Sequence, residues 1–305
     1  MAGIESWGTT LILWLQSFRG PVADTFFKLI TFLGEEKFCL ILLPLIYWCI
    51  NKRVGLRLAV LVMASNLANQ ALKYTFRLPR PTEPPVRRLG SEVGPGFPSG
   101  HTQTATVAFG YLAVRIQRWP AHLTAAALVF LLALSRMYLG MHFPHDVLGG
   151  LLFGYIILFV YVKGMPAVEG AWRTLPRAAR YALALGAPLA VLIVMGIFWP
   201  GSDVAGSLGT LAGFGAGALV EGEAVRFSTA GTALQRVLRF LAGFVGVAVL
   251  YFGLKMVPVE APAWDLVRYA GVGFFGSAVA PWLFVRLGLA QVEASAAPHM
   301  APAGP

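Results

Sequence analysis

The sequence predicts an all-α fold, a polytopic bundle of transmembrane helices, from three observations. Of its 305 residues 57% are hydrophobic and only 12% are charged, whereas a soluble domain carries about 25% charged residues. The mean hydropathy is +0.69. Long apolar runs recur along the chain and are separated by short loops rich in Pro, Gly, Lys and Arg. Together these features indicate an integral membrane protein.

The first 35 residues differ from the rest, because their two apolar segments are each too short to cross a bilayer. Trp7 and Trp14 are suited to the membrane surface, where aromatic side chains with a polar group gather. We therefore expect residues 1–35 to form amphipathic helices lying at the interface. The first apolar run has no basic start, so a cleavable signal peptide is not expected.

From residue 36 onward the chain contains about nine candidate spans. They cover residues 36–50, 54–74, 101–117, 120–138, 145–163, 180–199, 204–220, 236–255 and 266–286. The loops on one face carry the larger share of Lys and Arg, which predicts that this face is cytoplasmic. The same rule explains the net charge of +10, so nucleic acid is not expected as a partner.

Four chemically costly residues interrupt two apolar runs: Arg136, His142, His145 and Asp146. Pro144 suits the first turn of a helix, which makes Phe143 its N-cap and puts Asp146 at the third helical position. From there the carboxylate of Asp146 can accept a hydrogen bond from Nδ1 of His142, leaving Nε2 unprotonated. The stretch taken alone fits a nucleophilic histidine and an ion pair at a helix end equally well.

A polar stripe runs along the predicted helix 54–74, with a spacing of three or four residues. It consists of Asn66, Asn69, Gln70 and Lys73. Such a stripe faces either a wet interior or another helix, with which it forms hydrogen bonds. Lys73 differs from the others because it leads toward Arg77 and Arg80 in the following loop.

The loop 75–97 is too rich in proline and glycine to be helical, and it ends directly before a predicted span. Ser99 can cap that span. The backbone N–H groups of Gly100 and His101 then form a positively polarised seat for an anion. His101 on its own is as well explained as a capping or interfacial residue.

Three clusters are thus expected at the same membrane face: Lys73 with Arg80, residues 99–101, and residues 136–146. The loop charges predict that this face is non-cytoplasmic. A phosphate monoester carries a charge of about −1.5 to −2 near neutral pH, so Arg80 and Arg136 can grip its oxygens while Lys73 adds a point charge. His142 can attack phosphorus, and His101 can protonate the departing oxygen and then activate water. The sequence contains no carboxylate cluster suited to Mg²⁺, so neither a metal nor a cofactor is expected.

These residues resemble the type 2 phosphatidic acid phosphatase superfamily, whose signatures read K-x6-RP, PSGH and SR-x5-H-x3-D. All three signatures are intact in this sequence. The resemblance implies a metal-independent membrane phosphatase with a phosphohistidine intermediate. It assigns catalytic roles to His142, His101 and Asp146, and it assigns phosphate binding to Lys73, Arg80, Ser99, Gly100 and Arg136.

Within this superfamily the overall plan is similar to that of glucose-6-phosphatase and of sphingosine-1-phosphate phosphatases. The expected substrate is an amphiphilic phosphate, either a lipid phosphate or a polyprenyl diphosphate. A hexose phosphate, a phosphotransferase reaction on the same site, and a non-hydrolytic lipid-phosphate binder or transporter remain alternatives.

The distribution of these residues also predicts how the chain is divided. Residues 36–163 hold the three signatures and are expected to form the catalytic core. Residues 164–290 are rich in Gly and Ala, which allow helices to pack closely, and are expected to form an accessory bundle. The Ala- and Pro-rich tail 291–305 is predicted to be disordered. The oligomeric state is not indicated.

Overall fold

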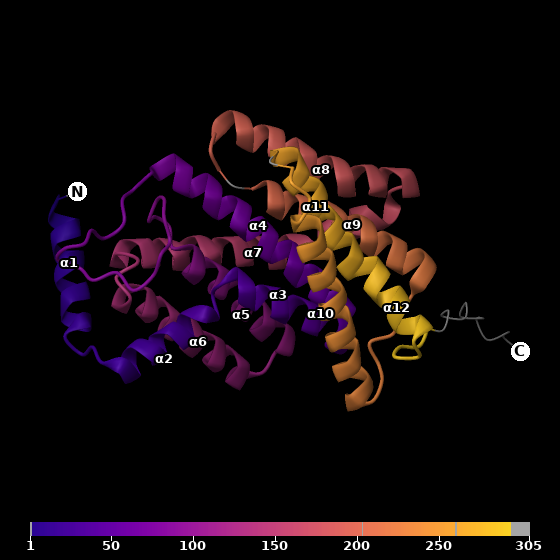
Figure 1. Ribbon diagram of the computed structural model, residues 1–305, viewed down its shortest axis with the longest axis horizontal. Coiled ribbons are helices and arrows are strands. Elements are labelled where there is room, and N and C mark those ends of the chain that lie inside the picture. Colours follow the sequence, from indigo (N-terminus) through magenta and orange to yellow (C-terminus); the bar gives the residue numbers. More distant parts are fainter. Residues whose placement is uncertain (1, 203, 260, 294–305) are drawn as a thin grey trace, which may run out of the picture.

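The computed structural model describes residues 2–202, 204–259 and 261–293, and its regular elements in those ranges are helices (Figure 1). An isolated antiparallel bridge joins Phe227 to Val292. The all-α prediction is therefore confirmed. Four of the described helices are long and apolar enough to cross a membrane: α6 (Trp119–Tyr138), α7 (Pro144–Thr174), α8 (Arg177–Phe198) and α10 (Ala233–Lys255).

Every predicted span coincides with a helical segment. The remaining segments are α3 (Glu36–Pro44) with the π-helical turn η1 (Leu45–Ile50), α4 (Lys52–Phe76), α5 (Gly100–Ile116), α9 (Ala205–Val220) with the π-helical turn η2 (Glu221–Val225), and the run α11 (Pro262–Phe274), η3 (Phe275–Val279) and α12 (Ala280–Arg286). The number of membrane crossings stays a prediction, since only four helices satisfy the length and hydropathy criteria.

Helix α7 is longer than its predicted span, which was expected to end at residue 163 before a basic loop. It continues to Thr174, and α8 begins at Arg177. A helix of 31 residues is about 46 Å long, more than the hydrocarbon core of a bilayer. The fall in hydropathy marks where the apolar stretch ends, but it does not end the helix. Glu169 on this extension accepts two hydrogen bonds of 2.6 Å from Arg57 of α4.

The N-terminal helices α1 (Ala2–Gln16) and α2 (Pro21–Phe32) lie at one end of the molecule, opposite the end formed by α8 to α12 (Figure 1). Gln16 donates to the backbone oxygens of Arg87 and Tyr138, at 2.7 and 3.0 Å. The hydroxyl of Tyr138 donates to Asp24 at 2.6 Å. These helices therefore hold the loop 77–99 and the end of α6 in place. Their location at a membrane interface stays a prediction.

The polar stripe of α4 forms hydrogen bonds between helices. Asn66 donates to Ser207 of α9 at 2.9 Å, and Asn69 donates to Gln103 of α5 at 2.9 Å. Gln103 in turn donates to the hydroxyl and the carbonyl of Ser65. For the asparagines, the packing role is therefore confirmed. The network fixes α4 against the N-terminal half of α5, close to Ser99.

The accessory helices pack closely through small residues, as predicted. Gly209, Gly213 and Gly217 of α9 face the backbone of α11, where a Cβ atom would lie 1.9 to 3.0 Å from a backbone oxygen. Arg239 of α10 is fully buried and donates to four backbone carbonyls, one of them that of Trp48 in η1. A buried contact thus joins the accessory helices to the N-terminal half of the chain.

The predicted tail is only partly described. At its start, Glu293 forms an ion pair of 2.8 Å with Lys52, which also pairs with Glu221 at 3.2 Å. The remainder, 294–305, lies outside the described residues.

Candidate active site

The segment between α6 and α7 adopts the predicted cap. Phe143 is the N-cap of α7, Pro144 is its first residue and Asp146 is its third. The backbone N–H of Phe143 donates to Oδ2 of Asp146 at 2.9 Å. This contact fixes the carboxylate of Asp146, which is fully buried, beside the residue that precedes Phe143 in the loop.

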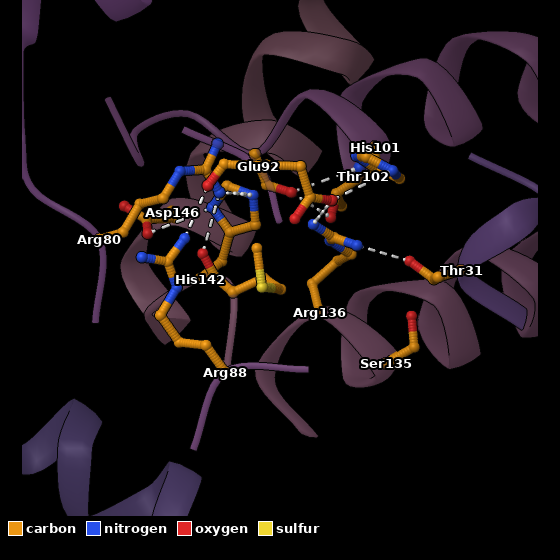
Figure 2. A network of polar contacts seen from close by, with 12 residues as sticks. Thr31, Arg80, Arg88, Glu92, His101, Thr102, Ser135, Arg136, His142 and Asp146 are labelled. Carbon is orange, nitrogen blue, oxygen red and sulfur yellow. Dashed lines mark hydrogen bonds and ion pairs between the residues drawn. The ribbon is translucent and has the colours of Figure 1, made fainter. Parts of the chain in front are cut away.

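That preceding residue is His142, which is 1% exposed. Its Nδ1 lies 3.4 Å from Oδ2 of Asp146 but forms no hydrogen bond with it. Its Nε2 lies 3.1 Å from Nη1 of Arg80 (Figure 2). A guanidinium group can only donate, so this contact requires an unprotonated Nε2. In the neutral ring the proton is then on Nδ1, the nitrogen that faces Asp146.

Burial and the positive charges of Arg136, Arg80 and Lys73 hold the pKa of His142 well below its ordinary value. The imidazole is consequently neutral at physiological pH. A neutral imidazole whose Nε2 lone pair is directed into a cluster of cations is the form required of a nucleophile that attacks an anionic substrate.

The two arginines of the signatures approach from different elements. Arg80, in the loop after α4, donates to the carbonyls of Gly94 and Met141, each at 3.0 Å. Arg136, in the last turn of α6, is 2% exposed. It donates to Thr31 of α2 at 2.7 Å and to Oε1 of Glu92 at 2.6 Å. Backbone contacts fix Arg80, whereas the main partner of Arg136 is another side chain.

The N-terminus of α5 lies at the position predicted for the anion seat. Ser99 is the N-cap and its hydroxyl accepts from Thr102. At Gly100 a Cβ atom would lie 3.0 Å from Oδ1 of Asn69, so a larger residue would crowd the first turn. His101 follows, and Lys73 lies in the last turn of α4. We call the space bordered by Arg80, Arg136, His101 and this helix N-terminus the phosphate seat.

Three residues of the site were not assigned a role from the sequence. Thr31 contacts Arg136, although it precedes the predicted start of the catalytic core. His145 lies 3.3 Å from Oδ1 of Asp146 and stacks on the ring of Phe143.

The third is Glu92, whose Oε1 lies 2.6 Å from Arg136 and 3.8 Å from Nε2 of His101. A sequence signal for it existed, since Glu92 is the only acidic residue between Arg88 and Pro98.

A cavity of about 470 Å³ opens beside the phosphate seat, and its wall is mostly the loop after Arg80. The lining residues are Arg80, Pro81, Thr82, Glu83, Arg88, Glu92, Val93 and Gly94. Arg80 and Glu92 belong both to this cavity and to the site, so the cavity adjoins the phosphate seat.

Comparison with known proteins agrees with this geometry. The PAP2 superfamily matches residues 54–169, and the PAP2 superfamily phosphatase transmembrane extension matches residues 205–292. The chain belongs to the PAP2 superfamily. The first of the two matched ranges contains all three signatures of the PAP2 site, and the second contains α9 to α12. The chain is thus an integral membrane protein of this superfamily.

Several curated PAP2 relatives are similar over part of the chain. Lipid phosphate phosphatase delta of Arabidopsis thaliana is 31% identical, over 51% of this chain and 41% of its own length. Sphingosine-1-phosphate phosphatase 2 of Homo sapiens is 35% identical, over 41% of this chain and 34% of its own. The chain therefore spans well under half the length of these curated relatives.

Among solved structures, the chain is similar to LpxE of Aquifex aeolicus. The two sequences are 28% identical and the TM-score is 0.47. The match covers 50% of this chain and 93% of the other.

Proposed function

We propose that this protein is a membrane phosphatase that hydrolyses a lipid phosphate or a polyprenyl diphosphate through a phosphohistidine intermediate on His142. The observation that supports it best is the contact between Nε2 of His142 and Nη1 of Arg80, which requires an unprotonated Nε2 inside a cationic, buried site.

Substrate binding follows from the charges of the phosphate seat. The phosphate oxygens replace the neighbouring imidazole and carboxylate as partners of Arg80 and Arg136, and Lys73 adds a third positive charge. The N–H groups at the start of α5 donate to the remaining oxygens. Because these groups are fixed before binding, they stabilise the charge of the transferring phosphoryl group without reorganising.

The reaction then proceeds in two steps. Nε2 of His142 forms a bond to phosphorus while the bond to the leaving oxygen breaks, and protonated His101 gives that oxygen its proton and becomes neutral. In the second step His101 takes a proton from water, whose oxygen attacks phosphorus and breaks the bond to Nε2. Asp146 faces the Nδ1–H of His142 and stabilises the positive charge that the ring acquires.

The surroundings of the site and the names of the relatives both indicate a substrate class. The relatives in this comparison carry names of lipid and sphingosine phosphate phosphatases, which favours a lipid over a sugar phosphate. Helix α1 exposes Trp7 and Trp14, and the turn between α1 and α2 exposes Phe18, each more than half. These side chains support an interfacial position for residues 1–35 and entry of the substrate from the adjoining leaflet.

Membrane orientation and chain division belong to the same proposal. The site faces the non-cytoplasmic side of a bundle of about nine spans. Residues 36–163 form its catalytic core and 164–290 its accessory bundle.

A substrate panel tests the proposed function. Phosphate release by the purified protein is measured with lipid monophosphates, polyprenyl diphosphates and hexose phosphates, with and without an alcohol acceptor. We expect release from lipid substrates and none after His142→Ala. Exclusive activity on hexose phosphates, or transfer to the alcohol in place of hydrolysis, would support those alternatives. No release from any substrate by a folded protein would indicate a binder or transporter.

A further inference from the structure

The carboxylate of Glu92 lies inside the phosphate seat. Figure 2 shows its side chain between the pair His142 and Asp146 on one side and the pair His101 and Arg136 on the other. Oε1 accepts a hydrogen bond of 2.6 Å from Arg136. Within the described part of the chain, no hydrogen-bond donor reaches Oε2, which is buried. The Glu92 carboxylate thus occupies the hydrogen bond from Arg136 that an oxygen of a bound phosphate requires.

The charge of Glu92 is secured by its surroundings. Burial alone would raise its pKa, but the charge and the hydrogen bond of Arg136 outweigh burial and hold the pKa below the usual value. Glu92 is therefore an anion at neutral pH. In the seat, it partly neutralises a cluster of cations that would otherwise attract any anion from the surroundings.

The loop that carries Glu92 can release its side chain. The side chain is 33% exposed and borders the cavity of about 470 Å³. Arg88 holds the backbone rather than the carboxylate, since it donates to the carbonyl oxygen of Glu92 at 2.6 Å. A change of side-chain rotamer toward the cavity can therefore empty the seat without unfolding the loop.

We propose that Glu92 is an internal competitor for the phosphate seat, which fills the seat at rest and sets a threshold that an anion must exceed to bind. This inference rests on the proposed function, because it concerns which anions reach the same site. A phosphomonoester brings a charge of about −2 and three terminal oxygens, so it replaces the contact of Glu92 and adds others. A phosphodiester group of a membrane lipid carries a charge of only −1 and has two such oxygens. Its contacts therefore do little more than replace those of Glu92. Glu92 thereby keeps abundant lipid headgroups out of the site.

Competition of this kind has a specific signature. Every anion that enters the seat must displace Glu92, and this displacement costs the same free energy for each of them. Removing the carboxylate removes that cost, so the affinity of every anion rises by the same factor. One hydrogen bond to a buried charged group raises the affinity of a ligand by about tenfold or more. A residue that merely positions Arg136 would have the opposite effect, because its loss would weaken binding.

The experiment compares the full-length protein with Glu92→Gln and Glu92→Ala in an uncharged detergent at pH 8. The probes are inorganic phosphate and the short-chain phosphodiester dihexanoyl phosphatidylglycerol. Binding is measured by the ligand-dependent shift in melting temperature, and inhibition by the rate of hydrolysis of a lipid monophosphate. We expect both probes to bind about tenfold or more tightly to each variant, by a common factor, and the diester to become an inhibitor. The control, Glu36→Gln, removes one exposed carboxylate in α3 and should bind as the wild type does.

Unchanged or weaker binding of both probes by the folded variants would overturn the inference, as would a gain for one probe alone. The binding measurement needs no turnover. A wild-type protein that hydrolyses nothing while the variants gain affinity would therefore refute the proposed function and leave the role of Glu92 standing.

Discussion

At the scale of single residues, the site surrounds His142, the proposed nucleophile, with donors and cations. Arg80 keeps the lone pair on Nε2 of His142, and the neighbouring positive charges oppose protonation of the ring. In the proposed mechanism, Asp146 stabilises the cationic ring once phosphorylation begins. The free imidazole is consequently neutral over the whole physiological range.

This arrangement predicts the acid limit of phosphoenzyme formation. Protonation of Nε2 removes the nucleophile, so on the acid side the rate is lost as pH falls through the pKa of His142. Because that pKa is lowered, the loss should occur well below pH 6.5, the ordinary value for histidine. The second-order rate constant of phosphoenzyme formation, measured in single turnovers well below saturating substrate from pH 4 to 9, checks this because it reports the pKa of the free enzyme. A half-maximal rate at or above pH 6.5 would contradict it.

A second prediction concerns Thr31, which supports Arg136 from outside the three signatures. Thr31→Val keeps the shape of the side chain but leaves Nη1 of the guanidinium without its acceptor. Loss of such a charged hydrogen bond costs about 1.5–3 kcal/mol. We expect KM for a lipid phosphate to rise by about tenfold or more, with a smaller change in kcat. Thr25→Val, at an exposed position on the same helix, is the control. A normal KM in the first variant would show that Arg136 does not need this contact.

At the scale of elements, the close approach of α7 to α5 brings His142 close to the N-terminus of α5. Gly150 and Gly154 of α7 face the first two turns of α5, where side chains would collide with Ser99, Thr102 and Thr106. In addition, the backbone N–H of Ser99 donates to the carbonyl of Asp146 at 2.9 Å. Relative movement of these two helices therefore changes the distance between His142 and His101.

The glycines of α7 allow a matched test. In Gly150→Ala the new Cβ atom would lie 2.6 Å from the backbone oxygen of Ser99. The helices must separate, which costs about 1–3 kcal/mol in stability and should also lower kcat. In Gly164→Ala no atom of the described structure lies within 4 Å of the new Cβ atom, and helix propensity should stabilise the protein by about 0.5–1 kcal/mol. Melting temperature and kcat of both variants check this, and equal behaviour of the two would refute it.

At the scale of the whole molecule, the site lies at one end of the bundle and the accessory helices at the other (Figure 1). The two are joined by the buried aromatic cluster around η1 and by the contacts of Arg239. Hydrogen bonds from Asn66 to Ser207, from Tyr74 to Gly201 and from Trp199 to Thr75 also join them along α4, up to the turn that carries Lys73. The accessory helices thus act on the reaction through the stability and orientation of the core. They contribute no side chain to the described site.

The predicted orientation can be tested by labelling. Single cysteines are placed at Met256, exposed after α10 on the face of the site, and at Arg118, exposed between α5 and α6 on the opposite face. In intact cells a membrane-impermeant maleimide should label Met256→Cys and should label Arg118→Cys only after permeabilisation. The native Cys39 and Cys49 are buried, and the unmodified protein serves as the control. The reverse pattern would place the site on the cytoplasmic face.

The sequence by itself determined the helical class, the positions of the helices and most of the site. Apolar runs fix where helices form, and the spacing of Pro144 and Asp146 fixes the cap that holds the carboxylate beside His142, because these effects act within one or two turns. It did not determine the length of α7, since a helix need not end where hydropathy falls. The contacts of Thr31 and Glu92 with Arg136, and the contact of Arg80 with His142, join residues far apart in sequence or separated by a loop. Only tertiary packing brings them together, and it is this packing that decides which charges meet in the phosphate seat.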